Sequence, residues 1–254
     1  MRSLRFYLPG LLLVLIVTFV SCTKKDDNIN AVPVLKDAKL NISMMHMVTN
    51  NFVEFDKIQY TNTFGNLYSV ATLKYFLSDI YFYKSDGTSI FIDDEFYVDG
   101  RDASTLTFIP ETKLPPGDYT SISFIFGLSN KKNIDGAFPD APENAMEWPA
   151  PLGGGYHYMK LEGKVDSSSV INNFQAHTGP TYGNLNYVNV TLPESAFTVN
   201  SENIFLNIVM DINKWWANPN TLDLNEMTMV MGNQEMQEKL KANGQTVFTV
   251  EIIE

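Results

Sequence analysis

Short runs of β-branched and aromatic residues, separated by turn signals, recur along most of the chain. In residues 40–48, apolar and polar side chains alternate with a period of two, which is typical of a half-buried strand. Aromatic runs at 75–83 and 90–92 flank Asp86-Gly87, and this dipeptide between two such runs predicts a β-hairpin. Further strands are expected at 119–126, 156–165, 187–192, 204–211 and 246–253. The pattern predicts a mostly β fold, an elaborated antiparallel β-sandwich or open barrel with one or two short helices.

Helical patterning is confined to two segments. The clearer one covers residues 225–242 and ends at Asn243-Gly244, a good stop signal, and a shorter helix is expected at 69–74.

The acidic run Asp93-Asp94-Glu95 is expected to be a solvated turn, with a calcium site as the alternative. The Gly- and Pro-rich segment from 130 to 155 is long for a simple connection, and long ordered loops tend to carry function.

The composition is that of a globular protein, with 44% hydrophobic and 19% charged residues in a chain of 254. There are 18 basic and 29 acidic residues, and removal of a leader containing Arg2 and Arg5 leaves 16 basic residues and a net charge of −13. A surface this acidic repels phosphate backbones, so we expect no nucleic-acid partner. A single cysteine excludes an intramolecular disulfide and a cysteine-cluster metal site.

The N-terminus has the pattern of a secretory leader. Arg2 and Arg5 precede an apolar core at 11–17 that is too short to span a bilayer as a helix. Ser21 directly before Cys22 resembles a lipobox, so residues 1–21 are predicted to be a lipoprotein signal peptide and Cys22 the lipidated residue. Residues 22–36 are polar and lack periodicity, which predicts a flexible tether, and 37–254 are predicted to form a single β-rich domain.

These features predict an outer-membrane lipoprotein held to the lipid bilayer by an acyl anchor at Cys22. A lysine followed by Asp26-Asp27 just after the anchor resembles the surface-export signal of some Gram-negative lipoproteins. A plain solvated linker would have a similar composition. The sequence therefore leaves open whether the protein is on the periplasmic side or at the cell surface.

The sequence contains no nucleophile-elbow, phosphate-loop, dinucleotide-binding or zinc-protease motif, and no feature selects two carboxylates as a glycosidase pair. The three histidines are His46, His157 and His177, and each has an unusual context of methionine, glycine or aromatic residues. Imidazole suits copper and zinc, and thioether sulfur prefers Cu(I). A lone histidine on a strand is more often a structural residue, so a metal site and a packing role both remain open. The methionines at 227–236 and the Trp215-Trp216 pair are expected to fill the core.

Several segments, in order along residues 38–250, carry a family resemblance: 63–70, 73–80, 123–128, 146–149, 153–163, 174–179, 209–216 and 243–248. The most specific is Gly-Tyr-His-Tyr-Met-Lys-Leu-Glu-Gly, which ends at Gly163, together with the Trp148-Pro149 that precedes it. On these residues the chain resembles the MbnP-like copper-binding proteins, named for the periplasmic protein encoded beside methanobactin genes.

The resemblance implies a non-catalytic, extracytoplasmic copper-binding protein on a β-rich scaffold. Relatives bind copper through histidines and an oxidised tryptophan, kynurenine, which is made by a partner di-haem enzyme resembling cytochrome c peroxidases. By position, His46 and His177 are the preferred ligands, His157 is a third candidate, and Trp148 is the candidate for oxidation. Whether the ion is Cu(I) or Cu(II) stays open. The alternative is a surface lipoprotein that binds a glycan or protein partner through an aromatic-rich face, with structural histidines.

Overall fold

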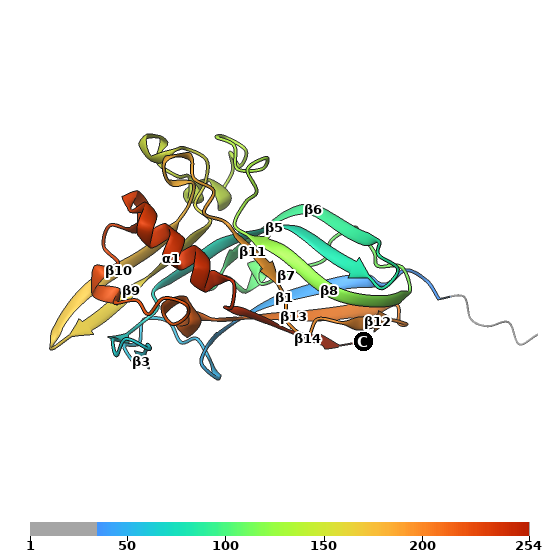
Figure 1. Ribbon diagram of the computed structural model, residues 1–254, viewed down its shortest axis with the longest axis horizontal. Helices are drawn as coiled ribbons and strands as arrows, with labels where there is room; N and C mark the ends of the chain where they lie inside the picture. The colour runs from blue at the N-terminus through green and yellow to red at the C-terminus, as the bar shows by residue number, and fades with distance from the viewer. Residues whose placement is uncertain (1–34, 254) are drawn as a thin grey trace, which may run out of the picture. The chain divides into compact units, whose positions relative to one another are not determined.

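The computed structural model describes residues 35–253, in which two β-sheets pack face to face around a shared hydrophobic core (Figure 1). The predicted mostly β fold is confirmed. The predicted signal peptide, Cys22 and the tether up to Val34 lie outside the described residues. Leu35–Glu254 makes up one compact unit. Within residues 35–253, no helix is both long and apolar enough to cross a membrane.

One sheet has five strands, in the order β14-β13-β1-β2, with β7 also paired to β1. Its strands are β1 (Lys39–Val48), β2 (Asn51–Phe52), β7 (Thr107–Phe108), β13 (Asn203–Asp211) and β14 (Phe248–Ile253). The β1–β13 pair is parallel, so this sheet departs from the fully antiparallel arrangement expected. The other strand pairs of the sheet are antiparallel.

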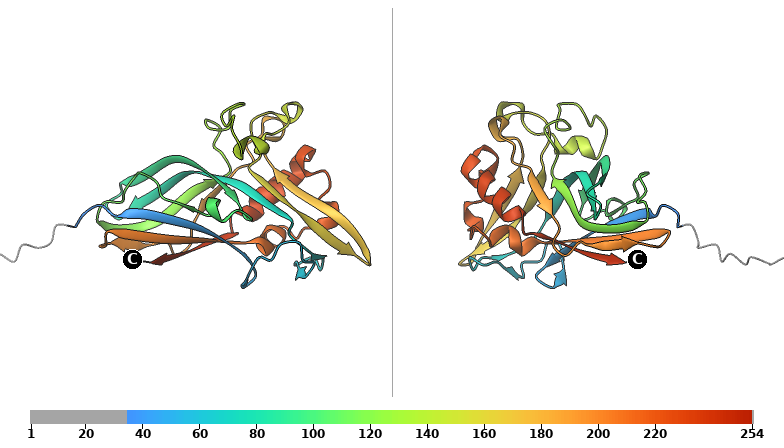
Figure 2. Two further views of the ribbon diagram at one scale, coloured as in Figure 1. Left: turned by 180° about the vertical axis from the view of Figure 1, so that it is seen from behind. Right: turned by 45° about the vertical axis from the view of Figure 1, so that its right-hand side comes forward.

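The second sheet has nine strands and is antiparallel. The long strand β5 lies at its centre and pairs with β6, β8 and β9, while β10 pairs with β9 and β11 with β8 (Figure 2). Its strands are β3 (Tyr60–Thr61), β4 (Leu67–Tyr68), β5 (Thr72–Lys84), β6 (Ser89–Asp99), β8 (Gly117–Phe126), β9 (Met159–Ser167), β10 (Val170–Thr178), β11 (Val188–Thr191) and β12 (Phe197–Val199).

The helical content differs from the sequence prediction. The α-helix α1 (Gln234–Gly244) begins after Asn233, whose side chain accepts a hydrogen bond from the backbone N–H of Met236, so the first half of the predicted 225–242 helix was wrong. The predicted helix at 69–74 was also wrong, since β5 begins at Thr72. The 3₁₀ segments are η1 (Ala103–Thr105), η2 (Glu143–Met146), η3 (Ala150–Leu152), η4 (Thr181–Gly183), η5 (Ile212–Trp216), η6 (Leu224–Glu226) and η7 (Val230–Gly232).

The inner faces of both sheets are apolar because their strands alternate as the sequence predicts. In β1, every second side chain from Leu40 to Val48 is buried, and the residues between them are partly exposed. These side chains meet those of β5 and β9 in one core that also contains Trp215 and Trp216. The acidic run at 93–95 was expected to be a turn, but it lies within β6, on a strand that hydrogen-bonds to β5.

A second, smaller hydrophobic cluster forms on the outer face of the nine-stranded sheet. The segment 129–158 folds back over β5 and packs Met146, Tyr156 and Tyr158 against Phe76 and Tyr97. This cluster anchors the Gly- and Pro-rich loop that the sequence singled out. The loop covers only part of the outer face, and both the candidate metal centre and an uncovered groove lie along it.

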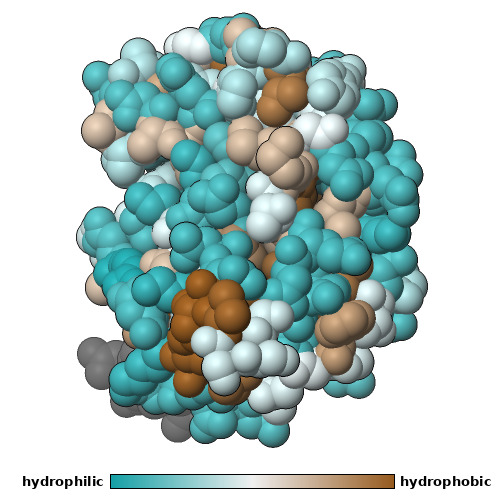
Figure 3. Space-filling model, turned by 90° about the vertical axis from the view of Figure 1, so that its left-hand side faces the viewer, coloured by the Kyte–Doolittle hydropathy of each residue, from teal (hydrophilic) through white to brown (hydrophobic). Residues whose placement is uncertain are grey.

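The β9–β10 hairpin extends from the sheet and ends in a two-residue turn at Ser168-Ser169, both with positive φ. Such a turn fixes the strand register, which here places His177 opposite Lys160. Figure 3 views the molecule from the side at which this hairpin ends, and that face is mainly hydrophilic with one compact hydrophobic patch. The exposed apolar side chains of the hairpin are Val170 and Ile171.

Candidate metal centre

A local pairing of two loop segments positions Trp148 and His157. The backbone N–H of Trp148 donates to the carbonyl of Gly155 over 2.7 Å, and that of His157 donates to the carbonyl of Met146 over 2.7 Å. Between these bonds, Glu147 and Tyr156 form an isolated antiparallel β-bridge. The two aromatic rings come into contact as a result, with centroids 4.7 Å apart and planes at 73°.

His157 is held as a neutral imidazole with one free nitrogen. Its side chain is buried, and Nδ1 lies 2.9 Å from the carbonyl oxygen of Met146. A carbonyl can only accept, so Nδ1 carries the proton and Nε2 has an unprotonated lone pair. Nε2 is buried without a hydrogen-bond partner in the protein. Burial, with a smaller contribution from the Lys160 charge, lowers the pKa of His157 to about 3, so the ring stays neutral at any physiological pH.

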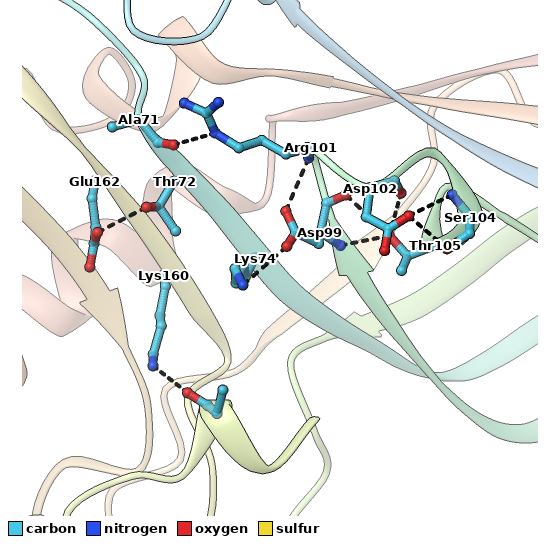
Figure 4. A network of polar contacts seen from close by, with 11 residues as sticks. Ala71, Thr72, Lys74, Asp99, Arg101, Asp102, Ser104, Thr105, Lys160 and Glu162 are labelled. Carbon is cyan, nitrogen blue, oxygen red and sulfur yellow. Dashed lines mark hydrogen bonds and ion pairs between the residues drawn. The ribbon is translucent and has the colours of Figure 1, made fainter. Parts of the chain in front are cut away.

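His177 projects from β10 toward the same point. Its Nε2 lies 2.7 Å from Oε1 of Glu162, which fixes the ring and leaves Nδ1 for another ligand. Glu162 also accepts a hydrogen bond from Thr72 over 2.9 Å, as Figure 4 shows. The hydrogen bond from His177 is the main cause that lowers the pKa of Glu162, so this carboxylate is ionised and acts as an acceptor.

The three aromatic side chains form a continuous row, Trp148–His157–His177. The two imidazole centroids are 5.1 Å apart with planes at 81°. Gly179 packs directly against the indole of Trp148. A Cβ at this position would lie 2.6 Å from Cζ3 of the ring. The indole N–H is already used, since it donates to the carbonyl of Leu152 over 3.2 Å.

His46 lies elsewhere. It projects from β1 into the main core, where its Nε2 is 2.9 Å from the hydroxyl of Tyr75. Tyr75 and Thr72 are three positions apart on β5, so their side chains point to opposite faces of the sheet, and Thr72 is on the face of Glu162 and His177. The expected pairing of His46 with His177 therefore differs from the structure, in which His177 contacts His157.

The donor chemistry of the row fits a soft or borderline metal ion. A buried imidazole nitrogen with no partner and a second imidazole oriented by a carboxylate are the parts of a histidine metal site. Within residues 35–253, no group of three or more His, Cys, Asp or Glu side chains is arranged to hold a metal. Two imidazoles thus supply the conventional donors, and Trp148 is the neighbour from which a further ligand atom would have to come.

A family model for MbnP matches residues 37–235. The chain belongs to the MbnP family. Among solved structures, MbnP from Methylosinus trichosporium aligns with a TM-score of 0.57 and 12% sequence identity, over 87% of this chain and 100% of that one. At this identity the likeness establishes the MbnP fold alone. None of the curated proteins matches the chain.

In this MbnP family member, a surface hollow of about 400 Å³ reaches Trp148. Its lining also includes Asp135, Glu147 and Gly155. The sequence prediction missed the residues that organise the row, namely Glu162, Gly179 and the carbonyl of Met146. Glu162 could have been found from the strand alternation, because it shares a face of β9 with Lys160, next to the segment of His177.

Proposed function

We propose that this protein is a lipid-anchored, extracytoplasmic copper-binding protein that captures or transfers copper at the cell envelope and has no catalytic turnover. The observation that carries the proposal is the row Trp148–His157–His177, in which a buried Nε2 lacks a partner. Membership of the MbnP family supports copper as the ion and the envelope as the compartment.

Each residue of the row has a defined role in this proposal. His157 offers Nε2 and His177 offers Nδ1. In each neutral ring the proton is on the other nitrogen, which donates it to the carbonyl of Met146 or to the carboxylate of Glu162. Neutral imidazole nitrogens hold copper without adding negative charge, and Glu162 orients the ring of His177. His46, buried beside Tyr75, is assigned a structural role.

Trp148 is the residue on which we propose that a partner di-haem enzyme acts. Its indole offers copper only a weakly interacting face, whereas kynurenine would offer an amino nitrogen and a carbonyl oxygen. The hollow beside Trp148 supports access from the surface. Anchoring through Cys22 at the outer membrane, facing the periplasm or the cell surface, completes the proposal.

Copper and zinc titration of the purified mature chain, with metal quantification and intact mass, tests this function. We expect one tightly held copper per chain, lost in the His157→Ala/His177→Ala variant and retained in the control variant His46→Gln. A mass gain that maps to Trp148 would add the oxidised ligand. Copper held equally tightly by the double variant and the wild type would refute the site, and stoichiometric zinc in preference to copper would refute the metal.

A further inference from the structure

A row of aromatic side chains lies on the outer face of the nine-stranded sheet, beyond the segment that covers Phe76. Tyr81 and Tyr83 are two positions apart on β5, so they share one face, with ring centroids 5.9 Å apart and planes at 17°. Phe91 on β6 stacks on Tyr81 at 4.5 Å and 20°. The end rings, Tyr83 and Phe91, are 37% and 39% exposed. Three nearly parallel rings thus lie on the outer face near the β5–β6 edge of the sheet, and the two end rings are exposed.

Two hollows flank these three aromatic rings, and both are lined by Asp79 and Tyr81. The larger has a volume of about 690 Å³ and lies between Tyr81, Phe91 and Tyr187. The smaller has about 330 Å³ and runs along β8 and β11, where hydroxyl and amide side chains line it: Ser123, Asn189 and Thr191. Together they form a continuous aromatic groove, and each volume is in the range of small-molecule sites, about 300–1,000 Å³.

Three carboxylates of the larger hollow surround one ammonium. The ammonium of Lys132 lies 3.1 Å from Asp79, 2.9 Å from Asp93 and 3.0 Å from Glu95. Asp79 reaches this position through a β-bulge, where the pairing of β5 shifts register and φ of Asp79 is 52°. The groove therefore presents carboxylate acceptors and an ammonium donor beside aromatic rings, and the three carboxylates around one ammonium give this cluster a net charge of −2.

We propose that the aromatic groove binds a neutral oligosaccharide. Pyranose rings have one face of C–H groups, which packs on the negative face of an aromatic ring, and a rim of hydroxyls that both donate and accept hydrogen bonds. The end rings supply the stacking surface, while Asp79, Asp93 and Asn189 supply rim partners. This inference is independent of copper, because no groove residue belongs to the row Trp148–His157–His177.

Other small ligands fit the groove less well. Phosphorylated ligands would meet the carboxylates of Asp79, Asp93 and Glu95 in a strongly acidic protein. A cationic ligand would compete with Lys132, whose ammonium already occupies the centre of these carboxylates. A neutral, polyhydroxylated ligand has neither conflict and uses both the donors and the acceptors.

The test is an array of neutral and anionic glycans from plant, microbial and animal sources, probed with the mature chain in the presence of EDTA. The best-bound oligosaccharide is then titrated calorimetrically. Tyr83→Ala and Phe91→Ala change exposed rings, so they should fold normally, and each should weaken binding at least about five-fold. Phe205→Ala, an exposed ring on the five-stranded sheet, is the matched control and should leave affinity unchanged.

The result that supports the proposal is chelator-resistant binding of neutral glycans that depends on Tyr83 and Phe91 and persists in the His157→Ala/His177→Ala variant. Three results would overturn it. These are no bound glycan on the array, binding restricted to anionic glycans, or affinity that both groove variants retain within two-fold of the wild type.

Discussion

The imidazole of His157 lies edge-on to that of His177, with ring centroids 5.1 Å apart and planes at 81°. The two residues reach this contact by different routes, one from a loop and one from a strand of the β9–β10 hairpin. Each ring has one nitrogen hydrogen-bonded to a protein acceptor, and these acceptors set which nitrogen is left for another ligand. The acceptors should therefore control the properties of the site as strongly as the histidines.

Glu162→Ala should weaken copper binding about 10- to 100-fold, because His177 would lose the carboxylate that orients it. Competition titration against a copper chelator measures the change. Glu162→Gln keeps a carbonyl acceptor and should recover part of the affinity. The control is Glu202→Ala, which removes an exposed ion pair with Lys36. Unchanged affinity in Glu162→Ala would show that the hydrogen bond to His177 plays no part in metal binding.

Gly179→Ala should displace the indole of Trp148, because the added methyl group would overlap the ring. We expect a loss of about 1–3 kcal/mol in the free energy of unfolding, measured by denaturant titration, together with weaker copper binding. Gly232→Ala is the matched control, since only the Tyr182 hydroxyl, at 3.5 Å, would approach its Cβ. If Gly179→Ala is as stable as this control, the indole of Trp148 does not pack closely against residue 179 in solution.

Period-two patterning in the sequence predicts many of the strands. It does not predict which residues form the candidate metal centre. The alternation at 40–48 predicts both the existence of β1 and which of its faces is buried. The segment at 69–74 was misassigned as helix because its short pattern suits both structures, and pairing with β9 decides for strand. The run 93–95 was misassigned because its charges suggested a solvated turn, whereas Lys132 from a distant loop forms ion pairs with Asp93 and Glu95 on the strand.

The candidate metal centre could be predicted only as a set of residue types. All three histidines were candidates, but their grouping depends on which face of each strand they occupy. Position along the sequence suggested the pair His46 and His177, although β5 separates them with Tyr75 on one face and Thr72 on the other. The contact of Trp148 with His157 depends on two backbone hydrogen bonds in a loop, which no side-chain pattern encodes.

Acid should destabilise the fold through His46. Burial lowers its pKa to about 4, an effect that the carboxylate of Asp99 partly opposes, and the other facing group, the Tyr75 hydroxyl, has a raised pKa and does not ionise here. Below the unfolded pKa of 6.5, the unfolded chain binds a proton that the folded chain excludes. Stability should therefore fall between pH 6.5 and about 4, by up to about 1.4 kcal/mol per pH unit.

His46→Gln removes this titration while its amide can still bond to Tyr75. Urea unfolding at several pH values should show a smaller loss of stability with acid in the variant, with the two curves parallel above pH 7. Parallel curves throughout the acid range would mean that His46 is protonated in the folded protein at its ordinary pKa.

Lys132 should be coupled energetically to Asp79, because both side chains are largely buried, with exposures of 12% and 14%. A double-mutant cycle with Lys132→Met and Asp79→Asn should give a coupling energy of about 1–3 kcal/mol in unfolding experiments. The exposed pair Lys36–Glu202, at 78% and 70%, is the control and should give less than about 1 kcal/mol. Equal coupling in the two pairs would mean that solvent screens Lys132 as fully as a surface lysine. In that case the carboxylates of the aromatic groove would not be held in fixed positions, and preorganised recognition of a ligand there would lose its physical basis.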